Sequence, residues 1–167
     1  ERRAMDFLSF LKEVIKLLDR TLIENIHIQL IHETGSYVIN ADPTRMQQMI
    51  MNLAVNARDA MPLGGELKFS LSSLWINGVA RVVEADLKPG HWLQLQVSDT
   101  GTGIELDVLP HVFDPFYTTK EPGKGSGLGL AQVWGIVTQH EGHISVTTVA
   151  DQGTTFTLYL PLLAQKA

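Results

Sequence analysis

Residues 52–62 read NLAVNARDAMP, a helical pattern that carries Asn52, Asn56 and Asp59. Asn and Asp are unfavourable inside helices, because their side chains compete for backbone hydrogen bonds. At about 100° per residue, the three side chains fall within about 60° of one another. The spacing predicts a polar row beside the apolar face of a helix. Such a row is either a solvated surface or a set of groups directed into a site, where an Asn oxygen suits magnesium.

The segments around this helix alternate between helical and strand periodicity. Residues 4–22 predict an amphipathic helix, and residues 42–61 predict a helix that starts at an Asp42 cap. Strands are predicted at 25–33, 37–40, 66–76, 91–99, 143–150 and 154–162, with an irregular hairpin connection at 77–90, a short helix at 105–113, a mobile loop at 114–127 and a helix at 128–140. This order predicts an α/β two-layer sandwich, a mixed sheet with helices on one face.

The composition limits the class of protein. A chain of 167 residues with 44% apolar residues can form one globular domain with a hydrophobic core. Its net charge of −5 argues against nucleic acid as a partner, because duplex binding needs a basic face. The absence of cysteine excludes disulfides and thiol chemistry and fits a reducing, cytoplasmic location. No apolar run approaches the roughly 18 residues of a membrane span.

The motif DTGTGI, residues 99–104, directly follows a predicted strand. One interpretation is a tight turn closed by the Asp99 side chain. The other is a carboxylate that accepts from an exocyclic amine, beside glycines that let the backbone approach a flat ring. Alone, the motif does not decide between them.

Two further motifs flank the loop. FDPFYTTK, residues 113–120, is either an aromatic plug or a lid anchored by Phe116, with Lys120 free to meet phosphate. KGSGLGL, residues 124–130, is either a flexible hinge or a helix start whose free amides bind phosphate oxygens. It is neither a Walker A motif nor a G-x-G-x-x-G fingerprint.

In this order, the motifs resemble those of the ATP-binding catalytic domain of bacterial sensor histidine kinases. That family shares the Bergerat fold with gyrase, the ninety-kilodalton heat-shock chaperone and MutL. The segments resemble, in turn, its N box, first glycine box, F box and second glycine box, and GTTF at 153–156 resembles its last turn. The resemblance covers roughly residues 7–162. It implies a remnant linker helix at 1–20 and a catalytic domain at 21–167.

The resemblance assigns the polar row to ATP and Mg²⁺. Asn56 would bind the magnesium that bridges the ATP phosphates, and Asn52 would line the same catalytic site. Asp59 and Ala60 would face the nucleotide. In the hydrolysing relatives, a Glu four residues before the magnesium Asn acts as general base on water. Asn52 holds that position and cannot take a proton, so the resemblance favours phosphoryl transfer to a histidine over hydrolysis.

The resemblance also assigns the glycine boxes and the lid. Asp99 would accept from the adenine amine, and Gly101, Gly103 and Ile104 would run beside the base. Thr154 or Thr155 would support the Asp99 network. The lid and the phosphate contacts would come from Phe116, Thr118, Thr119, Lys120, Lys124, Gly125, Ser126, Gly127, Leu128, Gly129 and Leu130.

The phosphoacceptor is not evident in this chain. The predicted helix at 4–22 contains no histidine, and His32, although followed by Glu33, ends a predicted strand. The resemblance therefore implies an acceptor on a separate dimerisation domain and a response regulator receiver domain as a further partner. We expect the isolated domain to be monomeric, and membrane attachment of the parent stays open. The alternatives are a hydrolysing Bergerat-fold ATPase, an anti-sigma-type serine kinase and a nucleotide-binding interaction domain.

Overall fold

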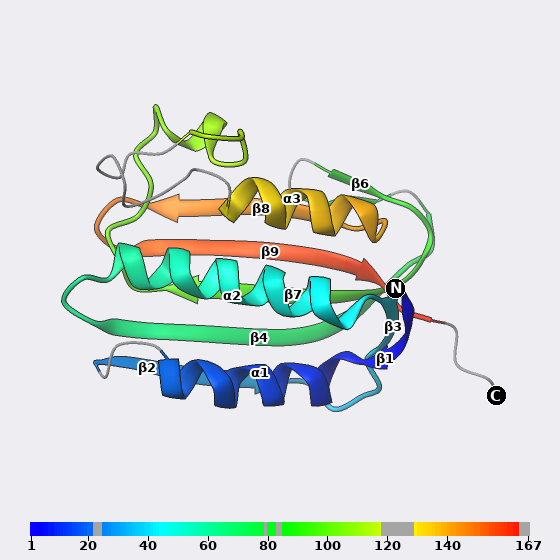
Figure 1. The fold of residues 1–167 in the computed structure, drawn as a ribbon. Coiled ribbons are helices and arrows are strands. Elements are labelled where there is room, and N and C mark those ends of the chain that lie inside the picture. Colours follow the sequence, from blue (N-terminus) through cyan, green and yellow to red (C-terminus); the bar gives the residue numbers. More distant parts are fainter. Residues whose placement is uncertain (22–24, 79, 83–84, 118–128, 164–167) are drawn as a thin grey trace.

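Three α-helices cover one face of a five-stranded mixed sheet (Figure 1). The computed structural model describes residues 1–21, 25–78, 80–82, 85–117 and 129–163. The sheet order is β2-β4-β7-β9-β8, with β2 parallel to β4 and the other neighbours antiparallel. These elements are α1 (Phe7–Thr21), β2 (Ile26–His32), α2 (Pro43–Ala60), β4 (Gly65–Ile76), β7 (Gly90–Asp99), α3 (Gly129–Gln139), β8 (His143–Val149) and β9 (Gly153–Pro161). The architecture confirms the predicted two-layer sandwich.

Two small antiparallel sheets complete the described fold. β1 (Arg3–Asp6) pairs with β3 (Val38–Ala41), and β5 (Ala80–Val82) pairs with β6 (Ala85–Leu87). The second pair confirms the hairpin expected between the two central strands. No helix among the described residues is long and apolar enough to cross a bilayer.

Two helix predictions were wrong in detail. Residues 4–6 form a strand instead of helix, because the Asp6 carboxylate caps α1 by accepting from the amides of Leu8 and Ser9, at 3.1 and 3.3 Å. Residues 105–113 form turns and a 3₁₀-helix at Leu109–His111. Pro110 has no amide to donate, and His111 bonds to the Val108 carbonyl at 2.9 Å, three residues back.

The start of α2 confirms the predicted Asp42 cap. Its carboxylate accepts from the amides of Thr44 and Arg45, and Pro43 occupies the first turn. The apolar face predicted from the spacing is buried in the core, as Met46, Met49, Ile50, Leu53, Ala54 and Ala57. The polar row is thereby directed along one edge of the helix.

The core lies between the helices and the sheet. Phe7, Leu11 and Leu18 of α1 are fully buried in the same cluster as α2 and the central strands. Burial of each such side chain contributes about 1.5–3 kcal/mol. The packing makes α1 part of the folded unit, and the predicted domain boundary after residue 20 stays a prediction.

Candidate functional site

Asp99, the last residue of β7, is the buried carboxylate of the site, with 8% of its surface exposed. Its Oδ1 accepts from the amides of Gly101 and Thr154, at 2.9 and 3.3 Å. Burial raises the pKa of this carboxyl, although the two amide hydrogen bonds oppose the shift. Oδ2 has no hydrogen-bond partner within the described ranges. The carboxylate is therefore fixed through one oxygen and offers the other as an acceptor.

The glycine loop after Asp99 packs tightly between α2 and the β8–β9 turn. A Cβ on Gly101 would clash with the Ala60 carbonyl, which also accepts from the Thr102 amide at 3.0 Å. Gly103 has a φ of +79°, and a Cβ there would lie 2.7 Å from the Val149 carbonyl oxygen. Glycine is required at both positions because backbone of the protein itself lies there, and the predicted approach to a base stays a prediction.

The polar row of α2 faces in two directions. The Asn52 amide donates to the Gly129 carbonyl at 3.3 Å and to Gln132 at 3.0 Å, so it contacts the start of α3. Asn56 is half-buried, and its side chain makes no hydrogen bond to any described residue. Asp59 is exposed and pairs with the Arg58 guanidinium at 3.3 Å. The amide of Asn56 is thus available to a ligand at the edge of the helix layer.

The part of the chain that the structure describes offers few charged ligands to a metal ion. No group of three or more His, Asp or Glu side chains gathers anywhere in the described part of the chain. The half-buried Asn56 amide, without a partner there, is a neutral oxygen donor of the kind that magnesium accepts. The donor set fits an ion that takes its remaining ligands from water and from a phosphate-bearing ligand.

Thr148 of β8 connects the glycine loop to the adjacent turn, and the sequence did not single it out. Its Oγ1 accepts from the Ile104 amide at 2.8 Å and lies 3.2 Å from the Gly153 carbonyl and 3.1 Å from Thr154 Oγ1. One threonine thus joins the end of the DTGTGI segment to the residue that bonds Asp99. No sequence signal separates Thr148 from the other threonines of these strands.

The two threonines of GTTF lie on opposite faces of β9. The Thr154 amide reaches Asp99, whereas Thr155 Oγ1 lies 2.9 Å from Ser98 Oγ. The sequence left open whether Thr154 or Thr155 contacts Asp99, and in the structure Thr154 makes the contact. Thr154 makes this contact through its backbone amide, and alternation along β9 places the two hydroxyl groups on opposite faces of the sheet.

The family model described as "Histidine kinase-, DNA gyrase B-, and HSP90-like ATPase" matches residues 41–164. The chain belongs to this family of ATP-binding domains. The resemblance inferred from the motifs is confirmed at this level.

Relatives and structures agree with the assignment. The chain is 39% identical to "Sensor kinase CckA" of Brucella abortus over 97% of its length, and 38% identical to "Sensor histidine kinase ZraS" of Escherichia coli over 74%. It spans only 17% and 23% of those two proteins. The catalytic domain of the histidine kinase ThkA superposes with a TM-score of 0.78 at 24% identity, over 97% of this chain and 96% of that one. This likeness shows a shared fold.

Within this ATPase-family domain, Phe113 is the phenylalanine of the FDPFYTTK segment that packs against the core. Its ring packs edge-on against the buried Phe156, with centroids 6.2 Å apart. Phe116, the predicted anchor, is 74% exposed and has a φ of 65°. Phe116 therefore does not pack against the core in this structure, and its predicted role in the lid stays a prediction. Tyr117 stacks on His111, whose Nδ1 lies 2.9 Å from Asp114.

Most of the predicted phosphate-binding residues cannot be compared with the structure. Leu130 packs against the core and Gly129 begins α3. Their predicted roles in nucleotide binding, like those of the other site residues, stay predictions. The remaining members lie outside the described residues: Thr118, Thr119, Lys120, Lys124, Gly125, Ser126, Gly127 and Leu128.

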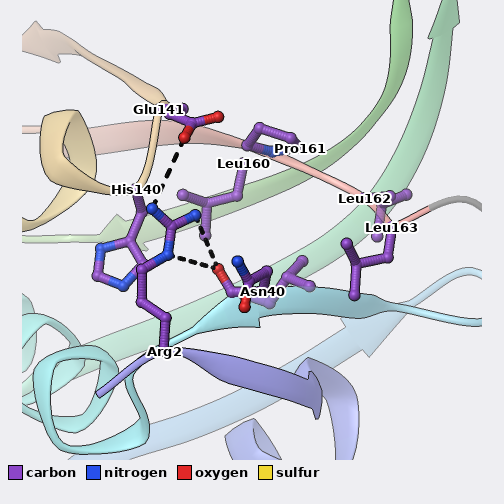
Figure 2. Close-up of a pocket in the computed structure, with 9 residues that line it drawn as sticks. Arg2, Asn40, His140, Glu141, Leu160, Pro161, Leu162 and Leu163 are labelled. Carbon is purple, nitrogen blue, oxygen red and sulfur yellow. Dashed lines mark hydrogen bonds and ion pairs between the residues drawn. The ribbon is translucent and has the colours of Figure 1, made fainter.

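A cavity of about 160 Å³ lies at the other end of α2 and α3 (Figure 2). Arg2 crosses it, bonding the Asn40 carbonyl at 3.3 Å and pairing with Glu141 at 3.6 Å. The buried His140 donates from Nδ1 to the Ile136 carbonyl at 2.8 Å and accepts the Asp42 amide on Nε2 at 3.2 Å. None of the predicted site residues lines this cavity, and its polar groups join the two helices to the N-terminal strands.

Proposed function

We propose that this chain is the ATP-binding catalytic domain of a sensor histidine kinase. It binds Mg²⁺-ATP and donates the γ-phosphate to a histidine on a dimerisation domain outside this chain. The buried Asp99, with one carboxylate oxygen bonded and the other open, is the observation that carries the proposal. A fixed acceptor beside a glycine loop selects the amine of adenine, because guanine presents a carbonyl oxygen there.

The polar row supplies the phosphate end of the site. Asn56, with Asn52 one turn before it, would hold magnesium through side-chain oxygens. When bound, the ion neutralises phosphate charge, while the protein contributes positioning. The α3 start and the segment at 118–128 would contact the phosphates through backbone amides and lysines.

Phosphoryl transfer is favoured over hydrolysis by the chemistry of the row. A hydrolase needs a group that accepts a proton from water. Asn52 carries an amide, and in this structure its two amide hydrogens are donated to Gly129 and Gln132 of α3. Asp59, two turns further along α2, is exposed and paired with Arg58. The polar row therefore contains no residue placed like the general base of the hydrolysing relatives.

The partners follow from the same proposal. The acceptor domain and a response regulator receiver domain would be supplied by the parent protein or by separate chains. The length of the relatives, of which this chain matches only 17% and 23%, supports a multidomain parent. We further propose that residues 1–20 act as a linker helix, that the isolated domain is monomeric and that it works in the cytoplasm without binding nucleic acid.

The test is a calorimetric titration of the domain with ATP, ADP and GTP, each with and without Mg²⁺. We expect adenine-specific, magnesium-sensitive binding with no turnover by the domain alone. Phosphate transfer should appear when a dimerisation domain bearing an acceptor histidine is added. Equal affinity for GTP would refute the adenine site, and turnover by the domain alone that is lost in Asn56→Ala would instead indicate a hydrolase.

A further inference from the structure

Three side-chain amides and one guanidinium form a chain of hydrogen bonds between α2 and α3, which lie side by side (Figure 1). Arg45 Nη1 donates to Gln48 Oε1 at 3.5 Å, and Gln48 Nε2 donates to Gln132 Oε1 at 3.2 Å. Asn52 Nδ2 donates to the same Gln132 oxygen at 3.0 Å. Gln132, on the first turn of α3, is therefore the acceptor shared by two residues of α2.

The donor and acceptor roles along this series of hydrogen bonds are determined at both ends. Arginine can only donate, so Gln48 must turn its oxygen toward Arg45 and its nitrogen toward Gln132. Gln132 must then present its oxygen to α2. At the other end, the Gly129 carbonyl can only accept, and it takes the second hydrogen of the Asn52 amide at 3.3 Å. Both ends require the same orientation of the Asn52 amide.

This orientation leaves one polar atom of Asn52 open. Both amide hydrogens are used, by Gly129 and by Gln132. Asn52 Oδ1 has no hydrogen-bond partner within the described ranges, and the side chain is half-buried on the polar row of Asn56. The open atom is thus a neutral oxygen, which suits a hard cation, whereas the reversed amide would present hydrogens.

We propose that Gln132 is a positioning residue for metal-dependent nucleotide binding, because it holds the Asn52 amide with its oxygen turned away from α3. The inference rests on the proposed function, since it concerns the same magnesium-nucleotide site. Gln132 itself is exposed, so its replacement removes little core packing. Its role is to select one of two amide orientations.

The experiment compares Gln132→Met with Gln132→Glu. Methionine has a similar length but is at best a weak acceptor, whereas glutamate keeps oxygens that accept from Gln48 and Asn52. The readout is the magnesium enhancement, defined as the ATP Kd without Mg²⁺ divided by the ATP Kd with Mg²⁺. The added negative charge repels magnesium-free ATP more than magnesium-bound ATP, so it cannot by itself lower this ratio in Gln132→Glu. The Kd for magnesium-free ADP reports on the rest of the pocket.

We expect Gln132→Met to lower the magnesium enhancement by about threefold to tenfold, the effect of one lost orienting hydrogen bond. Gln132→Glu should retain the enhancement, and magnesium-free ADP should bind Gln132→Met like the wild type. The proposal would be overturned if the magnesium enhancement stayed unchanged in Gln132→Met or fell equally in both variants. It would also be overturned if magnesium-free ADP binding to Gln132→Met weakened as much as the enhancement fell.

Asn56→Ala separates this inference from the proposed function. If the wild type shows an enhancement that Asn56→Ala lacks, the proposed site holds, and the Gln132 variants decide the inference alone. If the wild type shows no enhancement, the proposed magnesium site fails and the inference is refuted with it.

Discussion

Replacing Asp99 with asparagine should abolish adenine selectivity while leaving the fold intact. Asp99 Oδ1 accepts from the amides of Gly101 and Thr154. An asparagine oxygen can accept both, so its NH₂ group must occupy the place of the open Oδ2. The variant would then direct a donor at the adenine amine, which is itself a donor.

The magnitude follows from the hydrogen bond that is lost. A hydrogen bond to a charged acceptor contributes about 1.5–3 kcal/mol, which corresponds to roughly a 10- to 150-fold rise in the Kd of ATP. Stability should not fall, because burial raises the pKa of Asp99 and so disfavours its charged form in the folded state. The neutral amide avoids that cost.

Calorimetric titration with ATP and GTP measures the binding effect, and urea denaturation measures the free energy of unfolding. Asp99→Ala is the matched control, because it removes the acceptor and leaves the Gly101 and Thr154 amides unpaired. Each unpaired buried group should cost about 1–3 kcal/mol of stability. An ATP affinity unchanged in Asp99→Asn would refute the adenine role, and equal destabilisation by both variants would refute the hydrogen-bond argument.

Four further predictions test other parts of the structure. Because the pKa of Asp99 is raised, its carboxyl group holds a proton more tightly in the folded state than in the unfolded state. The contribution of Asp99 to the free energy of unfolding therefore falls as the pH rises from its unfolded-state pKa to its folded-state pKa. ATP affinity should fall on acidification through the raised pKa, and this step should be missing from the pH titration of Asp99→Asn. Gly101→Ala should clash with the Ala60 carbonyl and lower the melting temperature, while an unchanged melting temperature would contradict the close approach. Thr148→Val should weaken ATP binding about 2- to 10-fold in the same titration, with Thr148→Ser restoring it, because the hydroxyl holds the Ile104 amide. His140→Leu should lower the free energy of unfolding by about 1–3 kcal/mol in urea, since the Asp42 amide loses its acceptor, yet leave the ATP Kd unchanged.

Local sequence signals predicted most elements because the signal and the structure lie within the same few residues. The Asp42 cap, the apolar face of α2 and the alternating strands required only nearest-neighbour chemistry and burial. One of the two errors in the helices depended on a distant contact, and the other was local. Residues 4–6 became a strand because β3 lies beside them, whereas residues 105–113 formed turns and a 3₁₀-helix around Pro110.

The sequence by itself determined the family, the layer architecture and the residue types of the site. Motif order and periodicity are properties of the chain, so Asn56, Asp99 and the glycines could be proposed as site residues from the sequence alone. Only the tertiary structure decided which oxygen of Asp99 is open, that Thr148 joins the glycine loop to the β8–β9 turn, and that Gln132 accepts from the Asn52 amide. The hydrogen bonds from Thr154 to Asp99, from Ile104 to Thr148 and from Asn52 to Gln132 join residues 55, 44 and 80 positions apart. They depend on three-dimensional positions that no local pattern encodes.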